Sequence, residues 1–280
     1  MHMRSSTAAV VVLAVVAFVF ALLILAQLKF DPIAIDPHWT GTPLPPCFVD
    51  AKACEGHLLG TDELGRDVLA RLGRGGEITL GLSLIAVLFE IAIGASFGAL
   101  SRYGGRSLKY TIDRVAAALS CYPVWPFLIV IVCVATPPTR SAMPPIALAA
   151  ILAILLSPQV IHIIGSADDP RNIAPAGFNQ AARDFARIIA ILATVDFFRF
   201  GIQPPTPTWG NMLGLMAENF QVAWWAAVFP AICLFLAVLS WRFSGVDFSE
   251  AARVRTLEQV SHDRQGHSLG RKRPHGSRRA

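Results

Sequence analysis

The charged residues of this chain that could carry out chemistry are concentrated in one polar segment. Residues 57–71 read His-Leu-Leu-Gly-Thr-Asp-Glu-Leu-Gly-Arg-Asp-Val-Leu-Ala-Arg and include three carboxylates. Carboxylates could bind a metal ion, but no His or Cys lies at ligand spacing with them. The apolar segments contain neither a nucleophile–base pair nor a set of metal ligands. The sequence therefore predicts no catalytic residues and no metal site.

Three further ionisable residues, Glu90, Asp196 and Arg199, lie within apolar stretches. An Asp or Arg near the centre of a bilayer costs about 2.5–3.5 kcal/mol, although Asp196 and Arg199 could offset each other at i,i+3 spacing. Two interpretations stay open: these residues line a polar path between helices, or they mark a degraded helix. Glu90 would face a partner or a wet cavity, or would carry a proton.

The composition indicates which elements must position these residues. Hydrophobic residues make up 54% of the 280 residues and charged residues 15%, whereas soluble domains carry about 25% charge. A soluble enzyme is therefore a poor fit. Six apolar stretches could cross a membrane, namely residues 7–28, 78–100, 115–135, 146–164, 185–202 and 222–241. The expected fold is an all-α polytopic membrane protein with about six transmembrane helices.

The distribution of Lys and Arg predicts the orientation of these helices. If the N-terminus is cytoplasmic, the inner segments hold seventeen of the 24 Lys and Arg residues, so both termini are expected inside. The first stretch has no small-x-small cleavage site after it and is expected to be retained. The expected regions are an N-terminus with the first helix (1–28), an extracytoplasmic loop (29–76), a transmembrane domain (77–243) and a basic cytoplasmic tail (244–280).

The net charge of +5 resides in the C-terminal segment that begins at Arg242, since residues 242–280 hold nine Lys and Arg against four Asp and Glu. The tail has no folded nucleic-acid-binding motif, so contact with the lipid bilayer is expected rather than a nucleic-acid partner.

Cys47 and Cys54 share the extracytoplasmic loop, on the oxidising side of the membrane, and a disulfide between them is a hypothesis.

The polar segment is expected to form a short amphipathic helix. Thr61 could be its N-cap, with Asp62 and Glu63 in the first turn, where negative charge is favoured. Its apolar residues recur at helical spacing, and Asp67 and Arg71 could pair at i,i+4. Such a helix could lie on the membrane surface or contact an external protein.

Residues 57–69 closely resemble a signature of bacterial ABC-importer permeases, specifically the C-type inner-membrane subunit of the dipeptide, oligopeptide and nickel systems. A second match, residues 201–213, falls at the expected outer loop before the last helix, and Trp224-Trp225 and Phe229-Pro230 follow as in that subfamily. The first signature loop comprises Gly60, Thr61, Asp62, Glu63, Gly65, Arg66 and Asp67. The second comprises Gln203, Pro204, Pro205, Pro207, Trp209 and Gly210.

The resemblance implies the fold of a binding-protein-dependent transport inner-membrane component in the cell inner (plasma) membrane. Such a subunit forms half of a path for dipeptides or oligopeptides, together with a homologous permease subunit. Two cytoplasmic ATPase subunits would use ATP, an extracytoplasmic substrate-binding protein would deliver substrate, and this chain would bind no cofactor. A nickel or other solute importer is the alternative within transport.

The loop that couples such permeases to their ATPases departs from the family pattern of Glu-Ala-Ala, then Gly, then Ile-x-Leu-Pro. In one alignment the loop keeps only Gly165, Ile173 and Pro175, and the Glu-Ala-Ala part is absent. In the other, Gln180-Ala181-Ala182-Arg183 is a degenerate copy of that part. An uncoupled permease remnant is therefore a further alternative.

Overall fold

The computed structural model describes residues 31–37, 39–50, 56–121, 123–135, 144–167, 173–216 and 220–240. Within these ranges the regular secondary structure is helical. The β-type pairings are two isolated bridges in the segment before the first described helix. The described helices are α2 (Val68–Tyr103), α3 (Gly105–Ser120), α4 (Val124–Ala135), α5 (Pro145–Gly165), α6 (Ile173–Phe197), α7 (Trp209–Met216) and Trp225–Ser240. The expectation of an all-α protein is confirmed for these ranges.

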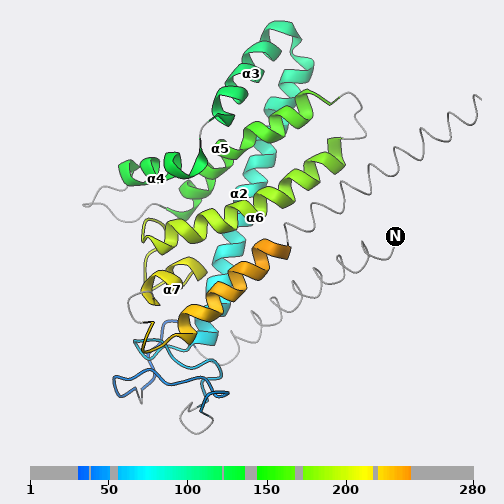
Figure 1. Ribbon diagram of the computed structural model, residues 1–280. Helices are drawn as coiled ribbons and strands as arrows, with labels where there is room; N and C mark the ends of the chain where they lie inside the picture. Colours follow the sequence, from blue (N-terminus) through cyan, green and yellow to red (C-terminus); the bar gives the residue numbers. More distant parts are fainter. Residues whose placement is uncertain are drawn as a thin grey trace, which may run out of the picture.

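Helix α2 is the centre of the bundle. It has 36 residues, and α3, α5, α6 and α7 all contact it. It begins at Val68 because Asp67 Oδ2 accepts a hydrogen bond from the backbone N–H of Ala70 at 2.7 Å and caps the first turn. Figure 1 shows α2 passing through the whole bundle, with α5 and α6 crossing beside it. Both α2 and α5 are long and apolar enough to cross a membrane.

Helices α2 and α5 approach each other closely at Gly94 and Gly98. A Cβ atom at Gly94 would lie 2.4 Å from the Cβ of Val160, and one at Gly98 would lie 2.7 Å from the Cβ of Ile164. Small residues four positions apart are typical of helix pairs in membranes, because they let two backbones come together. The α2–α5 contact therefore depends on the absence of side chains at these two positions.

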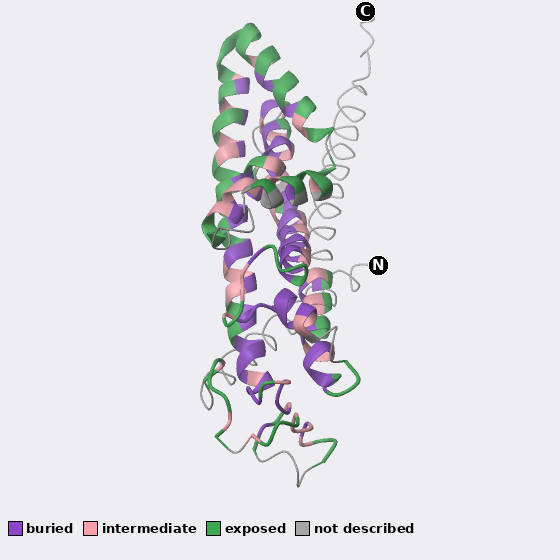
Figure 2. Ribbon diagram, turned by 90° about the vertical axis from the view of Figure 1, so that its left-hand side faces the viewer, coloured by how far each residue is buried: buried purple, intermediate pink, exposed green. Residues whose placement is uncertain are grey.

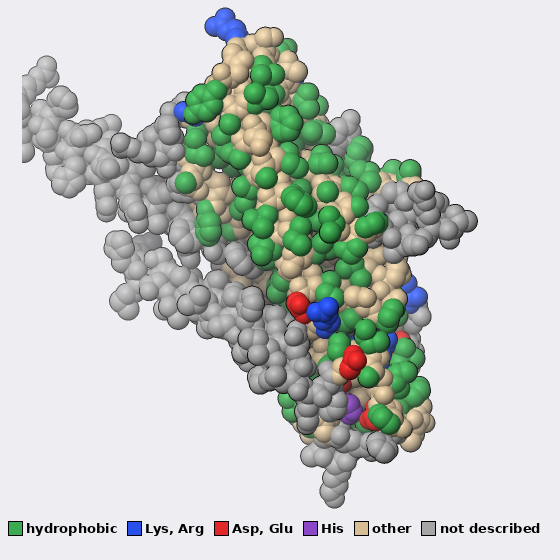
Figure 3. All heavy atoms as spheres, turned by 180° about the vertical axis from the view of Figure 1, so that it is seen from behind, with side chains coloured by type: hydrophobic (Ala, Val, Ile, Leu, Met, Phe, Trp, Pro, Cys, Tyr) green, Lys and Arg blue, Asp and Glu red, His purple; other side chains and the backbone are tan. Residues whose placement is uncertain are grey.

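The apolar core lies where α5 and α6 face α2 and α7. Its fully buried side chains include Leu148, Leu152, Leu156, Ile188, Ile189, Ile191, Leu192 and Trp209. The opposite side of α2 exposes Leu84, Ile85, Leu88, Phe89 and Phe97. Figure 2 shows buried residues on the inward faces of the helices, and Figure 3 shows hydrophobic side chains over most of one outer face. Such an extended exposed apolar surface favours contact with lipid or with another protein.

The third expected crossing, residues 115–135, is not one helix. α3 ends at Ser120 and α4 begins at Val124. The break falls at Pro123, whose ring removes a backbone donor and disfavours a helical conformation in the residue before it. The prediction of a continuous crossing here is wrong.

The remaining expected crossings are found in part. α6 begins at Ile173 rather than Phe185 and ends at Phe197 rather than Ile202, and the last expected crossing is found as Trp225–Ser240. Residues 7–28 and the tail 244–280 lie outside the described residues. The count of six crossings and the orientation of both termini therefore stay predictions.

Candidate functional site

Asp62 organises the polar segment that precedes α2. Its Oδ1 accepts hydrogen bonds from the backbone N–H groups of Leu64 and Arg66 at 2.9 and 3.0 Å. Its Oδ2 accepts from Nε of Arg66 at 2.8 Å, and Nη2 of Arg66 and Nε of Arg71 lie 2.7 and 3.4 Å from the same oxygen. Asp62, Arg66 and Arg71 are all buried. One buried anion therefore holds two buried cations and the turn that precedes α2.

His57 links this segment to the start of α2. Its Nδ1 lies 2.8 Å from Oδ1 of Asp67, and its Nε2 lies 3.1 Å from Oδ2 of Asp36. Asp67 is at the same time the N-cap of α2. The imidazole thereby connects an upstream loop, its own segment and the first turn of the helix.

The prediction of a helix beginning at Thr61 is wrong. Residues 61–67 form turns and isolated bridges. The reason is that the Asp62 carboxylate accepts from the N–H groups of the next residues, and this local bonding competes with helix formation. Oγ1 of Thr61 accepts from the backbone N–H of Leu44 at 2.8 Å instead of capping a helix. The expected ion pair between Asp67 and Arg71 is not formed, because Arg71 pairs with Asp62 instead.

Two glycines of the first motif are required by the backbone and its neighbours. Gly60 and Gly65 both have φ of +75°, in the region that favours glycine. A Cβ atom at Gly60 would lie 2.5 Å from the carbonyl oxygen of Leu44, and one at Gly65 would lie 2.5 Å from the Trp39 ring. Any larger residue would therefore displace the neighbouring chain. Glu63 of the same motif is half-buried.

The second motif leads into the N-terminus of α7. Oδ1 of Asn211 accepts from the Thr208 N–H at 2.9 Å, and Oγ1 of Thr208 accepts from the Asn211 N–H at 3.1 Å. This reciprocal pair satisfies backbone donors at the start of the helix. Trp209 is fully buried and donates from Nε1 to the carbonyl oxygen of Leu72 at 2.9 Å. A Cβ atom at Gly210 would lie 2.3 Å from the carbonyl oxygen of Ala193, so glycine is needed there.

The other residues of the second motif form the approach to α7. Pro207 is buried, whereas Pro204 and Pro205 are exposed. Gln203 is half-buried and donates from Nε2 to the carbonyl oxygens of Arg199 and Gly201. These contacts are to backbone carbonyls of the same loop between α6 and α7.

The two motifs lie at the same end of the bundle, around the start of α2. Trp209 donates to Leu72 as described, and Nε1 of Trp225 donates to the carbonyl oxygen of Thr61 at 3.0 Å. Figure 1 shows the polar segment, α7 and the unlabelled orange helix, Trp225–Ser240, gathered around the start of α2. We call residues 57–71 and 203–211 together the outer cap. Its charged groups are paired within the chain, which indicates a structural rather than a ligand-binding role.

The sequence did not indicate the partners that complete the outer cap. These partners are Asp36, Trp39 and Trp225. They lie 21 to 164 residues along the chain from the groups that they contact in residues 57–71. The Trp224-Trp225 pair was recognised only as part of the family resemblance. A buried indole needs an acceptor for its N–H, and this was the one signal that could have identified Trp225.

Asp196 and Arg199 do not lie in the middle of a helix. Asp196 is the next-to-last residue of α6, and its buried carboxylate accepts from the backbone N–H of Ile202 at 2.8 Å. Arg199 is exposed in the following turn, with φ of +62°. The structure therefore assigns Asp196 to the turn that leads into the second motif, which neither the polar-path nor the degraded-helix interpretation anticipated.

Cys47 forms a disulfide. Its partner is not among the described cysteines Cys121 and Cys233, which are free. Cys54 lies outside the described residues, so the pairing of Cys47 with Cys54 stays a prediction.

The end of the bundle opposite the outer cap holds the residues assigned to the coupling loop. Gly165 ends α5, and its carbonyl oxygen accepts from Nζ of Lys109 at 3.0 Å. Ile173 begins α6 and Pro175 lies in its first turn. Gln180 and Ala182 are buried within the same continuous helix. Between α5 and α6 there are only residues 166–172, of which residues 166 and 167 are described and non-helical.

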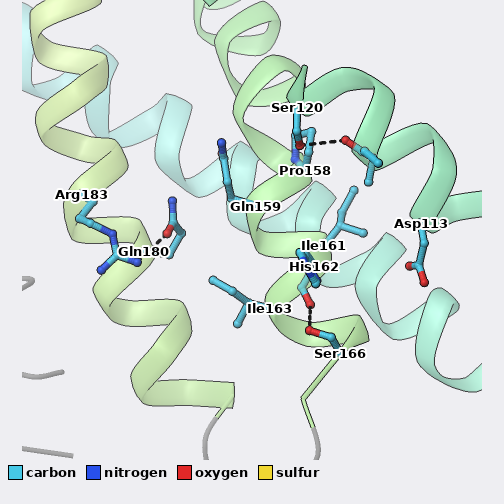
Figure 4. Close-up of a pocket in the computed structure, with 12 residues that line it drawn as sticks. Asp113, Ser120, Pro158, Gln159, Ile161, His162, Ile163, Ser166, Gln180 and Arg183 are labelled. Atoms are coloured by element: carbon cyan, nitrogen blue, oxygen red, sulfur yellow. Dashed lines mark hydrogen bonds between the residues drawn. The ribbon is translucent and has the colours of Figure 1, made fainter. Parts of the chain in front are cut away.

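A cavity of about 540 Å³ opens between α3, α5 and α6 at this end. Figure 4 shows Gln180 and Arg183 of α6 facing Gln159 of α5 across it. Its lining is mixed and includes Asp113, Ser120, His162 and Ser166 besides these three residues. No group of three or more His, Cys, Asp or Glu that could hold a metal ion occurs in the part of the chain that the structure describes.

Several known proteins are similar to this chain. The dipeptide transport system permease protein of Alkalihalophilus pseudofirmus is 28% identical over 216 residues, which is 70% of this chain and 71% of the relative. That of Haemophilus influenzae is 28% identical over 243 residues, 79% of this chain and 81% of the relative. A glutathione transport system permease protein of Pectobacterium atrosepticum is 27% identical over 215 residues, 70% and 71% of the two chains. No protein-family model matches the chain.

These relatives are all permease proteins of transport systems for small peptides. Their names agree with the resemblance seen in residues 57–69 and 201–213. They are transport subunits, which fits the expectation that the chain is not an enzyme.

Proposed function

We propose that this chain, a homologue of bacterial peptide-transport permeases, forms half of the transmembrane path of an ATP-driven importer for dipeptides or oligopeptides. The observation that carries the proposal is the similarity to permeases for dipeptides and glutathione over 70 to 79% of the chain. A cargo of small peptides is favoured over nickel because these relatives are named for peptides.

The importer would contain a second, homologous permease subunit, two cytoplasmic ATPase subunits and an extracytoplasmic binding protein. The partner ATPases would hydrolyse ATP, and this chain would bind no cofactor. The exposed apolar side of α2 supports a place in the inner membrane as a multi-pass protein, in contact with lipid or the second permease. Both termini would face the cytoplasm.

Within this assembly the outer cap would act as a rigid end piece. The hydrogen bonds of Trp209 and Trp225 fix the start of α2 and the polar segment before it against α7 and the last helix, so that the extracytoplasmic end of the path would keep its shape while the rest of the bundle moves. The alternation between two helix packings that a transporter requires would then occur below the cap.

An uncoupled permease remnant is the second candidate, and the short connection between α5 and α6 favours it. Residues 166–172 leave little room for a separate coupling helix. The burial of Gln180 and Ala182 inside α6 argues against these residues forming a cytoplasmic coupling loop. The alignment in which the Glu-Ala-Ala part is absent is therefore preferred.

Co-purification distinguishes the two candidates. The chain carries an affinity tag and is expressed with its partner permease and the two ATPases of its own system. A working permease is expected to retain both ATPases through purification, in stoichiometric amounts.

The matched comparison uses two insertions of equal length between Gly165 and Ile173, one with the Glu-Ala-Ala pattern and one of Gly and Ser. If the ATPases bind only to the chain with the Glu-Ala-Ala insertion, the remnant interpretation holds and the proposed function is wrong. Binding to all three chains supports a working permease whose ATPase contact lies elsewhere.

A further inference from the structure

Glu90 is a carboxyl group without a donor near the middle of the longest apolar helix. It is 0% exposed, and neither of its side-chain oxygens has a hydrogen-bond donor in the described ranges. An ionised carboxylate in such a place would carry a large desolvation cost. Ionisable residues inside a membrane bundle are therefore good candidates for a functional site.

The group that meets Glu90 is a second carboxyl, that of Asp184 on α6. The two side chains lie within hydrogen-bonding reach of each other, and Asp184 is also 0% exposed. Asp184 has cationic and polar partners of its own. Its Oδ2 accepts from Nε2 of Gln180 at 2.5 Å, and its Oδ1 lies 3.1 Å from Nη1 of Arg187.

This asymmetry determines where a proton would sit. Asp184 has Gln180 and Arg187 as direct partners that stabilise its negative charge, whereas neither side-chain oxygen of Glu90 has a direct partner of this kind. Two carboxyl groups can hydrogen-bond to each other only when one of them carries a proton to donate. The charged groups that act on Glu90 are Asp184 and Arg187, both on α6. The only titratable residue of α5 is His162, which lines the cavity, and α7 has none.

The cavity between α3, α5 and α6 gives this pair a connection to water. Gln180 lines the cavity and also donates to Asp184. Arg183, which donates to Oε1 of Gln180 at 2.6 Å, lies on the same wall. A cavity of about 540 Å³ with several polar groups is large enough to hold water. Figure 4 shows Gln180 directed from α6 toward this space.

We propose that Glu90 and Asp184 form a proton-binding site between α2 and α6, reached from the cavity through Gln180. A proton delivered by cavity water binds to a Glu90 carboxylate oxygen, and the resulting acid donates to the Asp184 carboxylate. Loss of the proton to cavity water leaves two buried anions facing each other across the α2–α6 contact. Proton binding therefore favours the packed arrangement of the two helices, and proton loss favours their separation. This property goes beyond the proposed peptide import.

Infrared spectroscopy of the full chain in lipid bilayers tests this proposal, because a protonated carboxyl has its own C=O stretching band. The chain is made with carboxyl-¹³C glutamate or, separately, with carboxyl-¹³C aspartate. At neutral pH we expect one carboxylic-acid band that moves with labelled glutamate and is lost in Glu90→Gln. The band should disappear as the pH is raised and return on acidification.

Glu77→Gln is the matched control, since it removes a half-exposed carboxylate from the same helix and should leave the band unchanged. Glu90→Asp covers the case in which Glu90→Gln does not fold. In the Glu90→Asp variant the carboxylic-acid band should move with labelled aspartate instead of labelled glutamate. The proposal is overturned if no glutamate band exists, or if the band persists in Glu90→Gln. Loss of the band on adding Na⁺ or K⁺ at constant pH would also overturn it, in favour of a metal-cation site.

Discussion

Replacing Asp62 by alanine is expected to destabilise the chain by about 3–5 kcal/mol, because removing one partner of a buried ion pair leaves the other charge uncompensated. Asp62 is the common acceptor for Arg66 and Arg71, both of which are buried. The substitution also removes the acceptor for the backbone N–H groups of Leu64 and Arg66, in the turn that precedes α2. The measurement is the thermal unfolding midpoint of the purified chain in detergent, together with the yield of monodisperse protein.

Glu77→Ala is the control for loss of a carboxylate. Glu77 pairs with Arg74 at 2.7 Å, but both side chains are about half exposed. A surface ion pair of this kind contributes about 0–1 kcal/mol. If Asp62→Ala unfolds at the same temperature as Glu77→Ala, the Asp62 network does not stabilise the outer cap.

Gly94→Ala is expected to disrupt the α2–α5 contact. The added methyl group would lie 2.4 Å from the Cβ of Val160, so one helix must shift. Overpacking a tightly packed contact costs typically about 1–3 kcal/mol. Thermal unfolding should show a lower midpoint, and the importer, if assembled, should lose transport even where the chain still folds.

Gly81→Ala makes the same chemical change in the same helix without the clash. A Cβ atom at Gly81 meets nothing within 4 Å. Since alanine is favoured over glycine in a helix by about 1 kcal/mol, this variant should be as stable as the original chain or more so. Equal loss of stability in both variants would show that the close approach at Gly94 does not control the α2–α5 packing.

Long apolar elements could be predicted from the sequence. Residues 78–100 and 146–164 correspond to the apolar parts of α2 and α5, because hydrophobicity and length are local properties of the chain. The break in residues 115–135 was also accessible in principle. Pro123 is visible in the sequence, but a membrane helix can tolerate proline when neighbours satisfy the freed carbonyls, so hydropathy alone did not decide between a kink and a break.

Helix starts were predicted poorly because the same side chains can serve two local structures. Asp62 and Glu63 suit the first turn of a helix, yet Asp62 instead bonds the N–H groups of its own turn, and Asp67 caps the helix. α6 begins at Ile173, well before the expected Phe185, and its first half includes the polar residues Gln180, Arg183 and Asp184. Asp184 is buried there all the same, as it meets Glu90 from another helix, which no local pattern reveals.

The structural role of the two motifs was not evident from the sequence. Spacing suggested a surface helix or an external contact, whereas the structure turns the charges of residues 62–71 inward. The contact between Trp225 and Thr61 joins residues 164 positions apart. A tie of this length depends on the whole bundle and could not be derived from the residues around either partner.

Uptake of a labelled dipeptide by a strain that lacks only this chain is the most direct test of the proposed role in peptide import. We expect uptake to be lost in that strain and restored when the intact chain is supplied again. We also expect that the Gly94→Ala chain does not restore uptake, whereas the Gly81→Ala chain restores it as fully as the intact chain does. Unchanged dipeptide uptake without the chain, or loss of nickel uptake in its place, would contradict the proposed role in peptide import.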